Sequence, residues 1–357
     1  MGLGSHRDLG YGVRMTDQSR HHDAAWLEGL LCAVLGAVVF SGKAIVAKLM
    51  YKLGADPFVV VGLRMAMAFP MFLAMAWWAG RPRGAASAPP VQALSRAQGW
   101  QIVGLGFCGY YLASTLDFVG LRYISASLER AILYLNPTIV LLLSALLLKQ
   151  RIRLAQVAAV LLSYGGVLIV WLHDWDAAAL APSSAHDMDG IEAMALGSLC
   201  VFLSAVSYAV YLMGSGQLVQ RIGSLRLVGW ASCAACAMCV AQWLVVYLGS
   251  QGRMGDVAHL PWQGWALSAL NATVCTVLPV WLVMRGVQLV GAAVASQVGM
   301  VGPLSTIWMA AAVLGEPVTW RLMLGTAAVL AGIVVLTRAG QASKPQPAVV
   351  LGTSRSA

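Results

Sequence analysis

The chain has 357 residues, of which 59% are hydrophobic and 10% are charged. A soluble domain usually has about 45–50% apolar and about 25% charged residues, so this composition excludes a soluble enzyme or binding domain and predicts an integral membrane protein. The net charge is +9, but the basic residues gather in the connections between apolar segments, so we expect a lipid bilayer and no nucleic acid as partner.

Ten apolar segments follow one another along the chain. Each approaches the roughly 20 residues that cross a bilayer core, and a backbone in lipid satisfies its hydrogen bonds only within a helix or a closed barrel. The segments are too uniformly apolar for alternating barrel strands. We therefore predict an all-α integral membrane protein with ten transmembrane helices, at about residues 27–47, 57–79, 100–118, 125–148, 154–172, 191–213, 227–248, 264–284, 289–314 and 319–337.

The remaining parts of the chain are polar. Residues 1–25 and 339–357 predict cytoplasmic disordered tails, because they hold no apolar core, and residues 174–190 predict an acidic outer loop. Two units of five predicted helices, at 26–173 and 191–338, make up the rest.

The lysines and arginines set the orientation of these helices. With the N-terminus inside, 15 of the 23 fall on the cytoplasmic side, 5 fall outside and 3 lie within helices. The positive-inside rule then places both termini in the cytoplasm, and we expect a multi-pass protein of the inner (plasma) membrane. On the outer side, Asp56 and Pro57 supply the capping residue and the first residue of the second helix.

The two units resemble each other in sequence. GLLCAVLGAVVF (Gly29–Phe40) matches GSLCVFLSAVSY (Gly197–Tyr208), and GLRYISASLERAILYLNPT (Gly120–Thr138) lies over GVQLVGAAVASQVGMVGPL (Gly286–Leu304). Five is an odd number of crossings, so the second unit enters the membrane from the opposite face. Such inverted repeats are typical of secondary transporters, whose substrate site lies near the midplane between the halves.

Four features are similar to a known family: Arg64 in the second helix, GLRYISAS before the fourth, NPT at Asn136–Thr138 and GEPVT at Gly315–Thr319. With the paired five-helix units, the chain resembles EamA-type transporters of the drug/metabolite transporter superfamily. One departure is Lys149-Gln150-Arg151, where that family usually has Gly-Glu-Arg. The resemblance implies a small-metabolite carrier, commonly an exporter, without ATPase machinery, enzymatic activity or a cofactor.

Five ionisable residues lie within or at the ends of the first unit's helices: Lys43, Arg64, Asp117, Glu129 and Arg130. The predicted orientations place all five at one level, toward the outer side. A charge at the membrane centre costs roughly 2.5–3.5 kcal/mol on insertion scales, so such residues usually pair or face a wet cavity.

Two interpretations of this layer stay open. A structural network would pair Arg64 with Asp117, and Lys43 or Arg130 with Glu129. Alternatively, the third cation is unpaired and meets a substrate carboxylate or phosphate, while an acidic residue carries a proton for coupled transport. The matching positions of the second unit are all neutral, which favours function: Tyr211, Ser232, Val283, Ala295 and Ser296.

The fourth helix adds a second signal. Pro137 removes a backbone hydrogen bond near Leu133, next to Tyr134, and Pro303 does the same near Gly299 at the matching place of the second unit. Paired breaks of this kind predict a binding site, although ordinary proline kinks are the alternative.

Further candidate cavity residues are Tyr110, Asn271 and Gln297, each of which could instead pack between helices. Cys233, Cys236 and Cys239 have the spacing of cluster ligands, but Ala and Met separate them inside a membrane helix, so we interpret them as packing residues and expect no metal site. The sequence has no Walker loop, G-x-S-x-G or H-E-x-x-H, which argues against a pump or hydrolase.

These observations predict a secondary-active exporter of a small polar or amphipathic metabolite that works by alternating access. Its substrate site would use Arg130, Glu129, Arg64, Lys43, Tyr134 and Asp117, with an anionic or zwitterionic substrate. The fifth and tenth helices would pack outside the cavity or form a homodimer contact. Alternatives are an organic-anion antiporter and a non-transporting membrane partner such as a flippase subunit.

Overall fold

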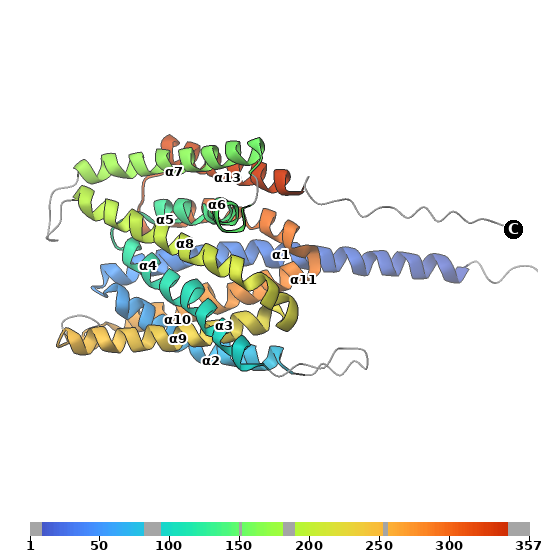
Figure 1. Ribbon diagram of the computed structural model, residues 1–357, viewed down its shortest axis with the longest axis horizontal. Coiled ribbons are helices and arrows are strands. Elements are labelled where there is room, and N and C mark those ends of the chain that lie inside the picture. Colours follow the sequence, from blue (N-terminus) through green and yellow to red (C-terminus); the bar gives the residue numbers. More distant parts are fainter. Residues whose placement is uncertain (1–8, 82–93, 150–151, 181–189, 253–255, 342–357) are drawn as a thin grey trace, which may run out of the picture.

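The computed structural model describes residues 9–81, 94–149, 152–180, 190–252 and 256–341, and this part of the chain is helical with no β-strand (Figure 1). The first half contains α1 Leu9–Lys52, α2 Pro57–Ala79, α3 Arg96–Gly106, η1 Phe107–Leu112, α4 Ala113–Leu121, α5 Ala126–Leu133, α6 Asn136–Leu148 and α7 Leu154–Leu180. The second half contains α8 Gly190–Ile222, α9 Ser224–Gly249, α10 Trp262–Ala272, η2 Thr273–Val277, α11 Leu278–Val298, α12 Val301–Met309, η3 Ala310–Leu314 and α13 Trp320–Gln341.

Within the described residues, nine helices are long and apolar enough to cross a membrane, where consecutive elements such as α5 and α6 count together. Large apolar side chains on their outer surfaces are exposed, among them Trp100, Leu146 and Leu154 at 76%, 75% and 85%. An exposed apolar surface of this extent requires lipid around it. The protein is therefore a multi-pass membrane protein.

The ninth predicted helix, at 289–314, is divided. α11 continues through a kink at Gly291, whose φ of 82° favours glycine, and ends at Val298. A shorter apolar helix, Val301–Leu314, follows. The break before α12 was predicted from Pro303, whereas the kink at Gly291 was not predicted.

The predicted breaks near the two prolines are confirmed. α5 ends at Leu133 and α6 begins at Asn136, while α11 ends at Val298 and α12 begins at Val301. In each case the proline is within the first three residues of the new helix, where its missing N–H costs nothing. The two breaks occupy matching positions of the two halves.

A second matched feature is a π-helical turn in the third helix of each half, η1 and η2. A π-turn holds one extra residue, and such turns are frequent at functional sites. Tyr110 belongs to η1 and Thr276 to η2.

The helices pack mainly in pairs that take one member from each half. α1 lies against α11, α2 against α9, and α7 against α13 along one edge of the bundle (Figure 1). In the last pair, Gly166 and Gly325 bring the backbones so close that a Cβ atom at either would overlap the partner's carbonyl oxygen. The predicted place of the fifth and tenth helices, outside the other helices, agrees with this edge position.

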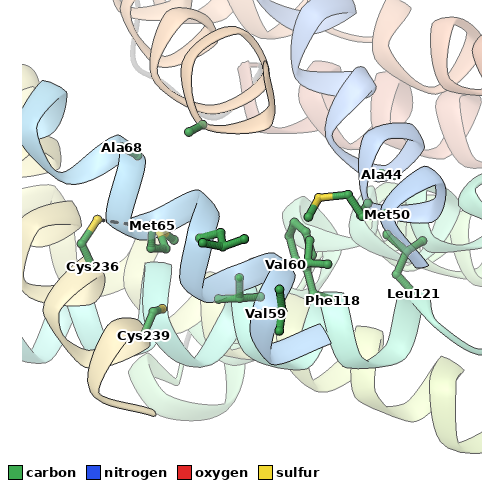
Figure 2. Close-up of a cluster of buried hydrophobic side chains, with 14 of the residues drawn as sticks. Ala44, Met50, Val59, Val60, Met65, Ala68, Phe118, Leu121, Cys236 and Cys239 are labelled. Atoms are coloured by element: carbon green, nitrogen blue, oxygen red, sulfur yellow. Dashed lines mark hydrogen bonds between the residues drawn. The ribbon is translucent and has the colours of Figure 1, made fainter. Parts of the chain in front are cut away.

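The apolar core gathers around α2 (Figure 2). Val59, Val60 and Ala68 are buried there, and the thiol of Cys236 on α9 lies 3.7 Å from the sulfur of Met65. All seven cysteines are free thiols, and the three on α9 are buried. The interpretation of these three as packing residues is confirmed.

Of the predictions for the ends of the helices, one is confirmed and another differs from the structure. The Asp56 carboxylate accepts hydrogen bonds from the N–H groups of Phe58 and Val59 at 2.8 and 3.0 Å, which confirms the predicted cap. α1, in contrast, begins at Leu9, so residues 9–25 are helical where composition predicts disorder. A helix that is already nucleated extends at little cost into polar residues. Residues 181–189 of the predicted acidic loop and 342–357 of the C-terminal tail lie outside the described residues.

Candidate substrate site

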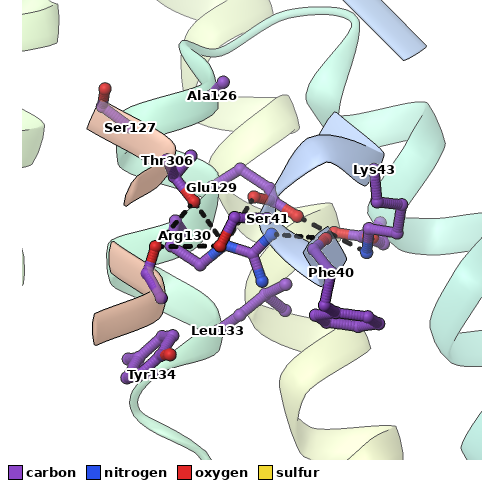
Figure 3. Close-up of polar contacts among 12 residues, drawn as sticks. Phe40, Ser41, Lys43, Ala126, Ser127, Glu129, Arg130, Leu133, Tyr134 and Thr306 are labelled. Carbon is purple, nitrogen blue, oxygen red and sulfur yellow. Dashed lines mark hydrogen bonds and ion pairs between the residues drawn. The ribbon is translucent and has the colours of Figure 1, made fainter. Parts of the chain in front are cut away.

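Four of the five predicted charges form a buried network on α1, α4 and α5 (Figure 3). The Lys43 ammonium lies 2.5 Å from Oδ2 of Asp117 and 3.7 Å from Oε1 of Glu129. Nε of Arg130 lies 3.9 Å from Oε2 of Glu129. Glu129 is fully buried and stands between two cations. We call these four residues the charge network; its formal charges sum to zero.

Arg130 ties this network to two other helices. Its Nε donates to the hydroxyl of Thr306 on α12 at 3.1 Å, and its Nη2 donates to the Phe40 carbonyl on α1 at 3.5 Å (Figure 3). Its guanidinium carbon also lies 5.3 Å from the centre of the Phe40 ring. Arg130 is therefore held by groups from both halves of the chain.

Arg64 lies outside the charge network, which corrects the predicted pair with Asp117. Lys43 occupies that carboxylate instead, and Arg64 makes no ion pair with any residue that the structure describes. Its Nη1 donates to the hydroxyl of Thr276 in η2 at 3.4 Å, and that hydroxyl donates to the Asn271 carbonyl at 2.7 Å. The guanidinium stacks near the Phe118 ring, 4.5 Å from its centre.

The other two guanidinium nitrogens of Arg64, Nε and Nη2, are the unusual feature of this site. The side chain is buried, with 3% of the residue exposed, yet Nε and Nη2 have no hydrogen-bond partner within the described part of the chain. The Nδ2 and Oδ1 atoms of Asn271 are also buried, and they too have no hydrogen-bond partner among the described residues. A buried cation normally finds partners, so an incomplete one marks a place where a ligand can supply them.

The broken helices meet between the halves. The Tyr134 hydroxyl donates to the Gly299 carbonyl at 2.9 Å, which is one of the acceptors that Pro303 frees. The Leu133 carbonyl, freed in the same way by Pro137, accepts from the side-chain amide of Asn136 at 2.6 Å. The contact between Tyr134 and Gly299 thus joins the two breaks.

This contact gives a testable prediction. A Cβ atom at Gly302 would overlap the Tyr134 hydroxyl, so Gly302→Val should force the two breaks apart. We expect the thermal midpoint of the purified protein to fall, whereas Tyr134→Phe, which removes only the hydrogen bond, should cost about 1 kcal/mol of unfolding free energy. Gly165→Val is the matched control, since no atom lies within 4 Å of a Cβ there. Equal midpoints for the Gly302 and Gly165 variants would contradict the prediction.

At the end of the bundle where α5 begins, Glu316 from the GEPVT stretch contacts the other half of the chain. Its carboxylate accepts from the backbone N–H of Ala126 at 2.9 Å and from the hydroxyl of Ser127 at 3.1 Å. An acidic side chain at a helix N-terminus is favoured by the helix dipole, and here it joins the two halves of the chain. We call this the Glu316 end.

At the opposite end, where α2 ends, two adjoining pockets separate the halves. One has a volume of about 240 Å³ and is lined by Glu28, Arg285 and Gln288, with Trp78 and Trp281. The other, of about 420 Å³, shares both tryptophans and is otherwise lined by Met71, Ala74, Met75, Thr273, Val277 and Leu278. We call the two together the cleft. Arg285 and Glu28 form an ion pair at 3.0 Å in it.

The remaining predicted site residues lie in different surroundings. The Tyr110 hydroxyl is 3.1 Å from that of Tyr211, which is a contact between helices. The side chain of Gln297 lies outside those that the structure describes. Phe118, Thr306 and Glu316 were not predicted as site residues; of these, only Glu316 carried a signal, as part of the GEPVT stretch.

Comparisons with known proteins agree with this architecture. The sequence model described as the EamA-like transporter family matches the chain twice, over residues 27–172 and 195–338. The uncharacterized transporter YcbK of Bacillus subtilis (strain 168) is 30% identical over 85% of this chain and 90% of its own length. The uncharacterized transporter YetK of the same organism is 21% identical over 85% and 83%. A crystal structure of a protein with 19% sequence identity shares the fold over 88% of this chain and 98% of its own, with a TM-score of 0.54.

Proposed function

Because this chain belongs to the EamA-like transporter family, we propose that it moves a small polar or amphipathic metabolite across the membrane by secondary-active transport, and that it is not an enzyme. The single observation that carries the proposal is the incomplete coordination of Arg64. A buried cation with two donors that no described residue satisfies, placed between the halves of a transporter, is suited to bind a solute and release it again.

The proposed topology has ten crossings in two inverted units, with both termini in the cytoplasm of a cell whose inner membrane holds the protein. The two matches of one family model, at 27–172 and 195–338, support the internal repeat. In this arrangement the ninth crossing is made by the segment after the Gly291 kink together with Val301–Leu314. The excess of basic residues on one side supports the orientation.

The proposed roles divide the predicted residues into two groups. Arg64 binds the anionic group of the substrate, because its Nε and Nη2 have no hydrogen-bond partner among the described residues. Lys43, Asp117, Glu129 and Arg130 hold the helices in register around it and neutralise one another, and Glu129 is the candidate proton carrier. Arg130, which the sequence predicts as a substrate-binding residue, is assigned instead to the residues that hold the helices in register, because Thr306 and Phe40 already accept hydrogen bonds from it.

If the protein works by alternating access, the conformation of this structure supports an exporter. The Glu316 end has hydrogen bonds between the halves, whereas the opposite end holds the cleft. Under the proposed orientation the cleft faces the cytoplasm, where an exporter takes up its substrate. The uncompensated charge of Arg64 also favours the second candidate, an antiporter that exchanges one organic anion for another.

The test measures which metabolites the protein moves. Cells that produce the unaltered protein are compared with cells that produce Arg64→Gln, by untargeted analysis of the culture medium and of cell extracts at equal protein levels. We expect at least one metabolite to accumulate outside only with the unaltered protein, and purified protein in liposomes to transport it. Identical metabolite profiles, or a liposome flux that Arg64→Gln leaves intact, would contradict the proposal.

A further inference from the structure

Arg64 lies on the same face of α2 as residues that line the cleft, although it is not itself part of the lining of either pocket. Arg64, Ala68, Met71, Met75 and Trp78 follow one another at spacings of four, three, four and three residues, which places them in one row along the helix. The last three line the apolar pocket of the cleft. The row therefore begins at a charged group and continues as an apolar wall.

The facing wall has the same order of groups. Thr276, which receives the Arg64 hydrogen bond, lies in η2 beside Val277, and Leu278 and Trp281 continue the wall along α11. The apolar pocket is a shallow and largely open groove, since Trp78 and Trp281 in its lining are 51% and 45% exposed, and its volume of about 420 Å³ is within the usual range for ligand sites of roughly 300–1,000 Å³. Its lining is almost entirely apolar, and the charged residues of the adjoining pocket, Glu28 and Arg285, neutralise each other.

The free donors of Arg64 have a defined geometry. Nε and Nη2 lie on one edge of the guanidinium plane and point in parallel, while the donor that is already used, Nη1, is on the other side. Two parallel N–H groups match the two oxygens of a carboxylate, which they bind as a fork. The missing partner is thus a planar group with two acceptor oxygens.

From these observations we propose that the substrate is an amphipathic carboxylate, whose head group binds the Nε–Nη2 edge of Arg64 and whose apolar body occupies the cleft between α2 and α11. This inference rests on the proposed transport function and adds the substrate class. In the present conformation Arg64 is buried, so the carboxylate meets it when the contact between Arg64 and Thr276 opens.

The charge balance of the site favours a substrate with a single negative charge. The charge network is neutral in itself, so the site offers one uncompensated positive charge. A carboxylate neutralises it, whereas a phosphate monoester with about −1.5 to −2 charges at pH 7 would bury an excess of negative charge. An amine or an alcohol leaves the arginine without its partner.

Equilibrium binding of radiolabelled octanoate to the purified full chain in nanodiscs of zwitterionic lipid tests the proposal, with empty nanodiscs as background. We expect saturable binding, and displacement by unlabelled octanoate at concentrations about tenfold or more below those of octan-1-ol, octylamine or acetate. Octyl phosphate should displace less well than octanoate. This series needs no variant, so it decides the matter even if substitutions at Arg64 fail to fold.

Variants then locate the binding. Arg64→Gln should weaken octanoate binding by about 10- to 100-fold and Arg64→Lys by less, because lysine keeps the charge and loses the fork. Trp281→Ala should weaken it several-fold, whereas Trp308→Ala, at a 63% exposed tryptophan outside the cleft lining, should not change it.

Three results would overturn the proposal: displacement by octylamine or octan-1-ol at the same concentrations as octanoate, full binding by Arg64→Gln, or displacement of octanoate by phosphatidylglycerol added to the nanodisc, which would assign the cleft to an anionic lipid. Failure of the proposed function gives a different pattern, in which octanoate binds as described and no solute crosses the membrane.

Discussion

Glu129→Gln is expected to abolish transport and to destabilise the protein by about 3–5 kcal/mol, because it breaks a buried ion pair and leaves an uncompensated charge. Glu129 is fully buried, with Lys43 and Arg130 on either side. Without its carboxylate, the charge network has two cations and one anion, and Arg130 loses its ion-pair partner. The unfolding free energy and the flux into liposomes are the two measurements.

The control for this variant restores neutrality. In Glu129→Gln with Arg130→Met, the pair of Lys43 and Asp117 persists and no net charge is buried. We expect this double variant to recover most of the lost stability, because the matching positions of the second half, Ala295 and Ser296, are neutral in the same fold. Flux should stay absent if the network serves transport. Recovery of flux together with stability would reduce the network to a structural role.

The comparison of Glu129 with its neutral counterpart raises the question of which features could be predicted from the sequence. Hydropathy, the residue repeat and the two prolines predicted the helices and the paired breaks, because these depend on local chemistry and on spacing. The level of the five charges followed from counting helix directions. The sequence therefore predicted that these charges lie close together, and four of the five do.

Their pairing was available only in part: the predicted contacts of Lys43 and Arg130 with Glu129 are present, but the predicted pair of Arg64 and Asp117 is not. Whether Asp117 meets Lys43 or Arg64 depends on the rotation of α1, α2 and α4 about their axes and on side-chain reach, which no spacing within one helix reveals. The same holds for Thr306, which binds Arg130 across 176 residues of sequence. The structure thus separates a satisfied arginine from an unsatisfied one, although both look alike as charges in apolar segments.

The helix over residues 9–25 was not predicted for a different reason. Composition measures whether a segment can bury apolar surface, and residues 9–25 cannot. It says nothing about a helix that continues outward from a membrane segment where nucleation has already occurred, as α1 does from Leu9 onward.

Arg64→Met is expected to raise the stability of the substrate-free protein while it removes transport. Among the described residues, Nε and Nη2 of this buried arginine have no hydrogen-bond partner and its guanidinium has no ion pair, so little offsets its desolvation. Its replacement by an apolar side chain of similar length should add about 1–3 kcal/mol to the unfolding free energy, which is the order of the insertion cost of a charge in a membrane helix.

Arg130→Met is the matched comparison, since both arginines are buried at 3% exposure but only Arg130 has its partners in place. That variant should lose stability, because Glu129 is left with one cation fewer and Thr306 loses its donor. Opposite signs of the two stability changes, with transport lost in both, would identify Arg64 as a group kept for its ligand at the expense of the resting fold. A loss of stability in Arg64→Met as large as in Arg130→Met would instead show that the protein itself satisfies Arg64, and the site for an anion would have to lie elsewhere.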